Sequence, residues 1–213
     1  MQGKKILVTA GGTREMIDPV RFIGNISSGK QGIAIAQAAA QRGGKVTLIG
    51  ANLSAPIPTG IEYISVSTTD EMQRSLRSEF QNCDVLLMAA AVADAKPVAI
   101  SDKKIKKDQL TSLELEKNAD LLADLSSIKR EDQVIVGFSA ETGDVNLSEA
   151  NRKLVAKGLD FIYANDVSNG EIFGSDETHG WVISNEGHKE EFSRNTKTTL
   201  AHLLLDKAKD KLG

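Results

Sequence analysis

Short apolar runs alternate with longer amphipathic stretches along most of the chain. The runs Ile6–Val8 and Val85–Met88 are continuous rather than alternating, as is typical of parallel strands buried on both faces. Strands are expected over residues 5–9, 45–50, 61–66, 84–90, 133–138 and 160–164. Helices are expected over residues 30–42, after the capping residues 68–70, in a short stretch from 118, and over 146–157. Strands that alternate with helices predict an α/β fold, a doubly wound Rossmann-like parallel sheet.

The pattern changes after Val167. The runs 181–184 and 189–192 flank a polar turn and predict a hairpin, and a last helix is expected over about 195–211. Before that, an irregular lysine-rich segment over 95–109 precedes a predicted strand at 112–116. We therefore expect one domain over 1–213. Its Rossmann-like core would occupy about 4–167, and a small appended β element with a helix would occupy about 168–211.

Two clusters of small residues follow the first predicted strand. The strand ends at Gly11-Gly12, and Ser27-Ser28-Gly29 opens the next helix. Adjacent glycines allow a backbone to approach a ligand closely, and a helix start offers free N–H groups to an anion. A dinucleotide fingerprint passes directly from strand to helix, whereas here residues 13–28 form an insertion, expected to be a wide polar loop. An ordinary turn without a ligand is the plain alternative.

Composition and charge disfavour several classes of function. The net charge is −3, from 26 basic and 29 acidic residues, so there is no general basic field for nucleic acid. No apolar run approaches the roughly 18 to 20 residues of a membrane span. The chain runs from Met1 into a strand without a signal peptide, so a cytoplasmic protein is expected. Cys83 is the only cysteine, which excludes an internal disulfide and disfavours a cysteine-based metal site.

Several polar residues lie where open α/β sheets bind ligands. Asn25 precedes the second glycine cluster, and Asp94 follows the carboxyl end of a strand. Either is equally compatible with a turn or a solvated loop. Lysines at 103, 104, 106 and 107 form a cluster that by composition is typical of a solvated loop. Lys153 and Lys157 share a helix face, where dipole compensation at a helix C-terminus is the plain interpretation.

Seven short sequence blocks are recognisable together. They are T-A-G-G-T-R-E, D-P-V-R-F-I-G-N, S-S-G-K-Q-G, A-A-A-V-A-D, K-I-K-K, V-G-F-S-A-E-T and A-N-D-V. In this order, over about residues 4–206, they resemble the phosphopantothenate–cysteine ligases in their bacterial, CTP-using form. The resemblance implies a ligase of coenzyme A biosynthesis that joins 4′-phosphopantothenate to L-cysteine. CTP would convert the substrate carboxylate to an acyl cytidylate with release of pyrophosphate, and the cysteine amine would then displace CMP.

The resemblance also implies roles for individual residues. Asn25 and Lys104 would be catalytic, with Asn25 serving the conversion of the acyl cytidylate. The nucleotide would lie against Gly11, Gly12, Ala91, Asp94, Lys104, Ala119, Asp120, Leu121, Leu122, Phe138, Lys153 and Lys157. The phosphopantothenate part would lie against Asn25, Ser27, Ser28, Gly29, Ala91 and Lys106. Ala119 replaces a proline that is frequent in the family, a change that backbone recognition tolerates.

Cofactors and partners follow from the same resemblance. It implies Mg²⁺ held largely by the triphosphate, since no metal ligands are evident, and no flavin in this domain. It implies a homodimer with the site near the subunit contact and a lysine flap that can come from the neighbouring chain. The segments after Val167 and at 112–116 are the expected dimer elements. Bacterial relatives commonly carry a flavin-dependent decarboxylase ahead of this domain, so the chain is expected to be a stand-alone ligase or the C-terminal half of a longer protein.

Two other classes of function are alternatives to the ligase. The first is a nicotinamide-dependent Rossmann reductase, which the second strand disfavours because Gly50-Ala51-Asn52 supplies no acid for the ribose hydroxyls. Neither Tyr63 nor Tyr163 is followed four residues later by lysine. The second is a non-catalytic domain that assembles a partner enzyme, which the complete set of blocks disfavours.

Overall fold

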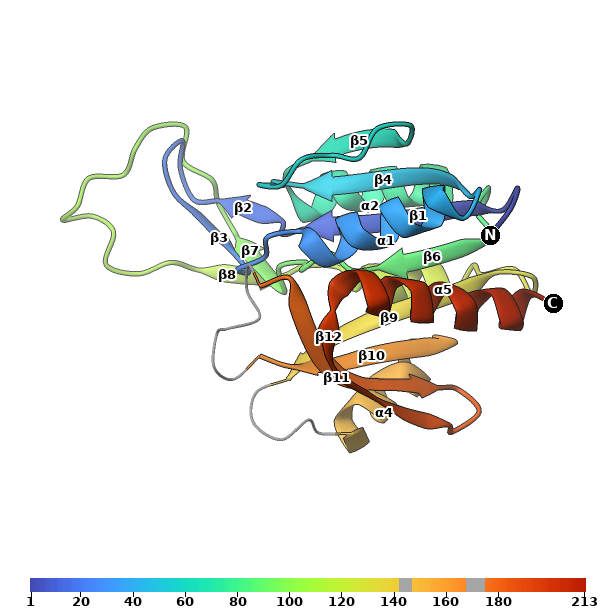
Figure 1. The fold of residues 1–213 in the computed structure, drawn as a ribbon. Coiled ribbons are helices and arrows are strands. Elements are labelled where there is room, and N and C mark those ends of the chain that lie inside the picture. Colours follow the sequence, from blue (N-terminus) through green and yellow to red (C-terminus); the bar gives the residue numbers. More distant parts are fainter. Residues whose placement is uncertain (142–146, 168–174) are drawn as a thin grey trace.

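The computed structural model describes residues 1–141, 147–167 and 175–213. At its centre is one eight-stranded sheet. Its strands are β1 (Lys5–Gly11), β4 (Lys45–Ala51), β5 (Glu62–Val66), β6 (Val85–Met88), β9 (Val134–Glu141), β10 (Phe161–Asp166), β11 (Glu177–Ser184) and β12 (Lys189–Thr196). The order across the sheet is β12-β11-β10-β9-β6-β1-β4-β5 (Figure 1). The strands from β10 to β5 are parallel, and β11 and β12 are antiparallel.

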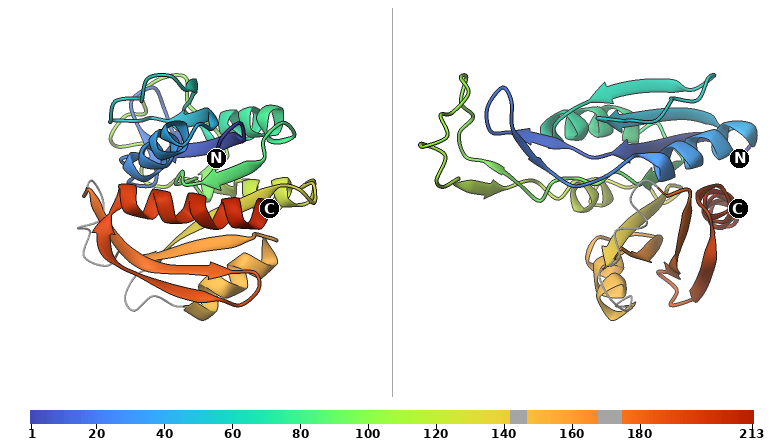
Figure 2. Two further views of the ribbon diagram at one scale, coloured as in Figure 1. Left: turned by 45° about the vertical axis from the view of Figure 1, so that its right-hand side comes forward. Right: turned by 60° about the vertical axis from the view of Figure 1, so that its left-hand side comes forward.

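Helices cover both faces of this sheet. On one face, Ile6 and Val8 pack in a core with α1 (Lys30–Gln41) and α5 (Lys197–Leu212), which lie side by side in Figure 2. On the other face, Leu7 packs in a core with α2 (Thr69–Phe80), α3 (Leu121–Ser126) and α4 (Leu147–Ala156). Successive residues of a strand point to opposite faces, so the continuous apolar runs are needed to fill two cores.

Local sequence signals set the limits of the helices. Thr68 caps α2 by accepting a hydrogen bond from the Glu71 N–H, and the Glu71 carboxylate accepts one from the Thr68 N–H. Helix α1 ends where Gly43 takes a φ of 75° and the Gly44 N–H donates to the Ala39 carbonyl at 3.0 Å. The sharp stop after α1 delivers the chain directly into β4.

An arm projects beyond the carboxyl ends of the central strands (Figures 1 and 2). It consists of the hairpin β2 (Arg14–Met16) and β3 (Phe22–Gly24), the hairpin β7 (Ala95–Pro97) and β8 (Leu115–Lys117), and the connections 17–21 and 98–114. The four strands of the arm have three residues each. The arm therefore has little regular structure of its own and depends on specific contacts for its shape.

The predicted α/β sheet and its C-terminal hairpin are confirmed, with differences in the C-terminal segment and in the short strands of the arm. The hairpin extends the main sheet through β10, and α5 shares a core with α1, so the core expected over 4–167 continues into the C-terminal segment. The loop expected over 13–28 contains β2 and β3, and the irregular segment from 95 begins with β7. The strand expected at 112–116 is β8, and the last helix starts at Lys197 because residues 195–196 belong to β12. Three-residue strands are too short for a periodic pattern to reveal.

Within the described residues, no helix has both the length and the apolar character needed to cross a membrane.

Candidate active site

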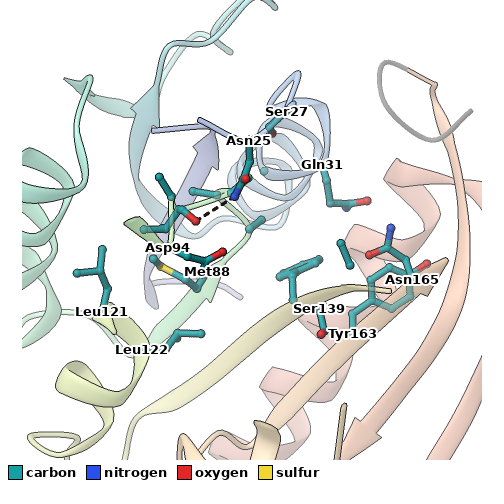
Figure 3. Close-up of a pocket in the computed structure, with 18 of the residues that line it drawn as sticks. Asn25, Ser27, Gln31, Met88, Asp94, Leu121, Leu122, Ser139, Tyr163 and Asn165 are labelled. Atoms are coloured by element: carbon teal, nitrogen blue, oxygen red, sulfur yellow. Dashed lines mark hydrogen bonds between the residues drawn. The ribbon is translucent and has the colours of Figure 1, made fainter. Parts of the chain in front are cut away.

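A cavity of about 870 Å³ opens at the carboxyl ends of β6, β9 and β10. Its walls come from the start of α1, the loop after β6, the start of α3 and the side of α4. It brings together these residues implied by the resemblance: Asn25, Ser27, Ser28, Gly29, Ala91, Asp94, Ala119, Asp120, Leu121, Leu122, Phe138, Lys153 and Lys157. Figure 3 shows Asn25, Asp94, Leu121 and Leu122 on one side of the cavity and Gln31, Tyr163 and Asn165 on the other.

Asn25 is tied to the loop that follows β6. Its Nδ2 donates to the Val92 carbonyl at 3.1 Å, the dashed contact in Figure 3. The loop is itself tied to the end of β1, because the Ala91 N–H donates to the Gly11 carbonyl at 2.8 Å. The stretch after β1 and the loop after β6, which are far apart in the sequence, therefore hold Asn25 and Ala91 close together at the carboxyl ends of the strands.

The start of α1 forms the upper wall of the cavity. Gly29 is the N-cap residue with a φ of 77°, and no side chain caps this helix. The positive end of the helix dipole therefore lies at this wall of the cavity, and the Lys30 N–H in the first turn donates to Ser28 Oγ at 3.4 Å. This arrangement suits an anionic group such as a phosphate or carboxylate.

Gly11 and Gly12 do not line the cavity. A Cβ on Gly11 would lie 1.9 Å from the Ala51 carbonyl oxygen, and a Cβ on Gly12 would lie 2.8 Å from the Asn25 carbonyl oxygen. The two glycines were expected to admit a ligand, whereas here they admit the chain's own backbone. Their packing positions Asn25 and Ala91, which do line the cavity.

The segment 118–122 joins Asp94 to α3. The Asn118 N–H donates to the Asp94 carbonyl at 2.9 Å, and its Nδ2 donates to the Ala93 carbonyl at 2.8 Å. Asp120 then caps α3 by accepting a hydrogen bond from the Ala123 N–H. Asn118 Oδ1 is buried and has no hydrogen-bond partner among the described residues. These contacts place backbone groups of 119–122 along the same wall as the exposed Asp94 side chain.

The two predicted lysines of α4 both reach the cavity, and each has a carboxylate partner. Lys157 Nζ lies 3.0 Å from Asp120 Oδ2. Lys153 Nζ donates to Glu141 Oε1 at 3.0 Å and to Ser139 Oγ at 2.9 Å, while Ser139 Oγ donates to the same carboxylate at 2.6 Å. Sequence reasoning assigned no role to Ser139 or Glu141, although both stand in the block V-G-F-S-A-E-T.

Residues at the far end of the cavity were not predicted either. They are Gln31, Tyr163, Asn165, Thr178 and Lys197. Tyr163 lies edge-to-face on Phe138 at 5.9 Å, and burial raises the pKa of its phenol although the hydroxyl is hydrogen-bonded to Thr178 Oγ1. Burial, followed by the neighbouring Lys30, lowers the pKa of Lys197. The block A-N-D-V was the one sequence signal that pointed to Asn165.

Lys104 and Lys106 lie outside the cavity, on the arm. Both side chains are exposed, and neither lines the cavity of the same chain. The residue between them, Ile105, is held against the connection 17–21. The structure therefore separates the predicted site into a pocket in the sheet and a pair of lysines on the arm.

No group of three or more His, Cys, Asp or Glu residues that could hold a metal ion occurs in the described parts of the chain. Cys83 is buried, and burial raises the pKa of its thiol to about 12. A thiol of this kind stays protonated at neutral pH and is a poor nucleophile. What the cavity offers is hydrogen-bond donors, paired cations and a helix start, which together suit the binding and activation of phosphorylated substrates.

Comparison with known proteins gives a consistent result. The family model described as the DNA/pantothenate metabolism flavoprotein C-terminal domain matches residues 1–212. The "Coenzyme A biosynthesis bifunctional protein CoaBC" of Mycobacterium tuberculosis is 43% identical over 217 aligned positions, which cover 97% of this chain and 52% of that protein. The protein of the same name from Bacillus subtilis is 42% identical, over 96% of this chain and 51% of that protein. The chain thus spans about half the length of the curated relatives it matches.

Solved structures show the same fold. A crystal structure of the C-terminal domain of CoaBC superimposes with a TM-score of 0.85 at 34% identity, covering 100% of this chain and 97% of that one. A Cab2 mutant in complex with phosphopantothenate-cysteine superimposes with a TM-score of 0.79. It is 16% identical and covers 98% of this chain and 87% of that one. At this identity the second likeness concerns the fold.

Proposed function

The chain belongs to the family of DNA/pantothenate metabolism flavoprotein C-terminal domains, and we propose that it is a phosphopantothenate–cysteine ligase that uses CTP in the cytoplasm. The observation that carries the proposal is the cavity. It gathers Asn25, Asp94, the segment 119–122, Phe138 and two α4 lysines at one edge of the sheet. Its relatives are named as CoaBC, a bifunctional protein of coenzyme A biosynthesis.

The first proposed step activates a carboxylate. An oxygen of the 4′-phosphopantothenate carboxylate bonds to the α-phosphorus of CTP, and the bond from that phosphorus to the bridging oxygen breaks. Pyrophosphate leaves with the electron pair, and an acyl cytidylate remains. Lys153, Lys157 and the start of α1 bind and orient the phosphates, so catalysis rests on positioning and charge stabilisation. Lys153 and Lys157 would exchange their present carboxylate partners for phosphate oxygens.

The second proposed step forms the amide. The neutral amine of L-cysteine attacks the acyl carbon, loses a proton, and CMP leaves with the electrons of the broken C–O bond. The contact from Asn25 Nδ2 to the Val92 carbonyl fixes the rotation of the amide, so that Oδ1 can accept a hydrogen bond from the attacking amine. No covalent enzyme intermediate is required.

We propose Mg²⁺ as a companion of the triphosphate rather than as a resident ion. Mg²⁺ usually keeps several waters and binds through one or two carboxylates together with substrate phosphates, so a dedicated cluster of protein ligands is not required. When bound, the ion would neutralise phosphate charge. No flavin is proposed for this domain.

The decisive assay measures pyrophosphate release and product formation from CTP, 4′-phosphopantothenate and L-cysteine. We expect turnover with all three, and far slower turnover when ATP replaces CTP. An Asn25→Asp variant should accumulate the acyl cytidylate and convert it poorly. Absence of turnover by a folded dimer would overturn the proposal, and equal specificity constants for CTP and ATP would overturn the nucleotide assignment.

The reductase alternative finds no support at the end of β4. Asn52, with a φ of 50°, donates from Nδ2 to the carbonyls of Gly12 and Ser67. An amide that is already used in this way, without a neighbouring acid, offers no acceptor pair to a ribose. Titration with NADPH should show no saturable binding.

We also propose that the protein is a homodimer joined through the arm. Large apolar side chains are exposed along it, namely Val20, Phe22, Val98, Ile100 and Leu115. Leu115 belongs to the predicted dimer segment at 112–116, whereas the edge strand β12 carries mostly exposed polar residues, half of the strand being charged, which discourages pairing. We propose that a second copy of the chain covers these exposed apolar side chains.

Sedimentation of a Phe22→Ser, Leu115→Ser double variant tests the dimer. We expect dissociation to a folded monomer, whereas Val155→Ser, which changes a residue 68% exposed on α4, should leave the dimer intact. A wild-type chain that is monomeric and active would contradict the assignment. If the arm serves the neighbouring site, mixing inactive Lys104→Ala and Asn25→Ala chains should restore activity, because mixed dimers would contain one undamaged site.

The longer relatives suggest a natural context. Because the chain spans about half of the bifunctional proteins it matches, we propose that it works beside a flavin-dependent phosphopantothenoylcysteine decarboxylase domain, fused or separate. That domain would consume the ligation product.

A further inference from the structure

The connection 98–114 of the arm carries the lysines at 103, 104, 106 and 107 and is called the lysine segment below. It contacts the β2–β3 hairpin at a buried carboxylate. Asp18, in the connection between β2 and β3, is 0% exposed although it carries a carboxylate. Its Oδ1 accepts hydrogen bonds from the N–H groups of Val20 and Arg21, both at 2.9 Å. Its Oδ2 accepts from Arg21 Nε at 3.0 Å and Arg21 NH2 at 2.5 Å. All of these bonds are local.

A fifth bond to Asp18 is not local. The N–H of Ile105, which is 87 residues away, donates to Asp18 Oδ2 at 3.2 Å. The guanidinium that binds Asp18 also donates from NH2 to the Ile105 carbonyl at 2.7 Å. Both backbone groups of Ile105 are therefore held by one Asp–Arg pair. A further bond from the Ser101 N–H to the Ile17 carbonyl, at 3.0 Å, runs alongside.

Ile105 separates the two lysines that the proposed function places at the phosphorylated substrates. Lys104 and Lys106 are exposed while Ile105 is half-buried. The Asp18–Arg21 pair neutralises itself and makes its contacts to this segment through the backbone of Ile105, so the lysine charges stay available to an external anion. Fixing the residue between two long, flexible side chains limits the space that both can search.

We propose that Asp18 is the positioning residue of the lysine segment. Through Arg21 and Ile105 it fixes Lys104 and Lys106 to the β2–β3 hairpin, so that the arm moves as one body rather than as a hairpin with a loose flap. The significance for catalysis rests on the proposed ligase activity, but the mechanical claim does not. The alternative role, a cap for the turn 17–21 alone, would leave the segment 98–114 unaffected by loss of the carboxylate.

Limited trypsin digestion of the full chain separates the two roles. The segment offers cleavage sites at Lys103, Lys104, Lys106 and Lys107. We expect Asp18→Asn to raise the cleavage rate at these sites roughly ten- to a hundredfold, because a buried charge-assisted contact is lost and the segment opens more often. Hydrogen exchange of the Ile105 amide should accelerate in parallel. Fragment masses would show cleavage confined to the segment, and circular dichroism would show a retained fold.

Asp132→Asn is the matched control. Asp132 also pairs with an arginine, Arg130, at 2.9 Å, but its side chain is 73% exposed and lies outside the arm. We expect its cleavage rate at 103–107 to equal that of the wild type. Arg21→Lys is the second variant, in case Asp18→Asn does not fold. It keeps the charge pair but removes the planar fork that joins Asp18 to the Ile105 carbonyl, and it should also raise cleavage.

A folded Asp18→Asn or Arg21→Lys chain that is cleaved at the wild-type rate would overturn the proposal. Activity supplies a separate readout. If the ligase assignment holds, Asp18→Asn should raise the KM of a phosphorylated substrate more than it lowers kcat, and high substrate should partly restore turnover. If the ligase assignment fails, the protease and exchange results still decide the role of Asp18.

Discussion

The pocket and the arm hold their functional residues by different physical means. In the pocket, side chains extend from the ends of strands and helices that are packed on both faces of the sheet, so their positions follow from the hydrophobic cores. The arm has three-residue strands, exposed apolar side chains and a lysine segment attached through a buried carboxylate. A site built partly on the arm gains mobile cations, but it depends on a few polar contacts and on a partner surface.

The largest expected effect concerns Gly11 at the end of β1, whose packing positions residues that line the cavity. Gly11→Ala should lower the free energy of unfolding by about 3 kcal/mol or more, since φ is 83° and the new Cβ would meet the Ala51 carbonyl oxygen at 1.9 Å. Gly60→Ala is the control, because φ is 80° there but nothing lies within 4 Å. It should cost only about 1 kcal/mol. Equal losses in urea unfolding would show that backbone strain, not close packing, makes Gly11 necessary.

A lysine from each region should separate activity from stability. Lys104→Ala, on the arm, should lower the kcat/KM of ligation about a hundredfold and change the unfolding free energy by less than about 0.5 kcal/mol. Lys153→Ala, in the pocket, should lower activity and also cost about 1 to 3 kcal/mol of stability, because Glu141 is 14% exposed and loses its cationic partner, keeping only the Ser139 hydroxyl.

The control for the arm lysine is its neighbour Lys103, for which the family resemblance implies no role. Lys103→Ala should retain near wild-type kcat/KM. A loss equal to that of Lys104→Ala would mean that the arm contributes general positive charge rather than a positioned group.

The stability contributed by the contacts among Asp18, Arg21 and Ile105 should be sensitive to acid. Burial by itself raises the pKa of Asp18, but hydrogen bonds from Arg21 and from backbone N–H groups outweigh it and hold the pKa well below its usual value. A lowered folded-state pKa contributes stability above the unfolded value near about 4, and the contribution is lost progressively as pH falls below that value. The difference in unfolding free energy between wild type and Asp18→Asn should therefore be constant above about pH 5 and narrow towards pH 3.

Urea titrations at several pH values measure this difference. Asp132→Asn, whose carboxylate is mostly exposed, should show little change from wild type at any pH. If the difference in unfolding free energy between wild type and Asp18→Asn stayed constant down to pH 3, it would contradict the lowered pKa of Asp18.

The smallest expected effect compares one aromatic contact in each region. In the arm, the guanidinium of Arg14 lies 4.6 Å from the centre of the Phe22 ring, which is 46% exposed. Phe22→Leu should cost at most about 0.5 to 1 kcal/mol in the monomer. Tyr163→Leu, at a buried ring packed between Phe138 and Phe192, should cost more in the same urea titration. The reverse order would show that the arm is better packed than its exposure indicates.

The sequence alone determined the sheet and one side of the site. Continuous apolar runs specify parallel strands, and open sheets bind ligands at the carboxyl ends of such strands, so the position of Asp94 was predictable, whereas the resemblance supplied Asn25 and Phe138. The resemblance then implied roles for Lys153 and Lys157, whose spacing of four residues already placed them on one helix face.

Only the tertiary structure decided the remainder. It brought Thr178 and Lys197 to the pocket through the sheet pairing of the C-terminal hairpin, gave Lys153 its partner Glu141, and left Lys104 on the arm. It also buried Asp18, which lies in a stretch predicted as a polar loop, and brought its carboxylate into a hydrogen bond with the Ile105 N–H. The physical reason is the distance along the chain over which sequence patterns act. Periodicity and turn chemistry act over a few residues, whereas these contacts join segments that meet only when the whole sheet has formed.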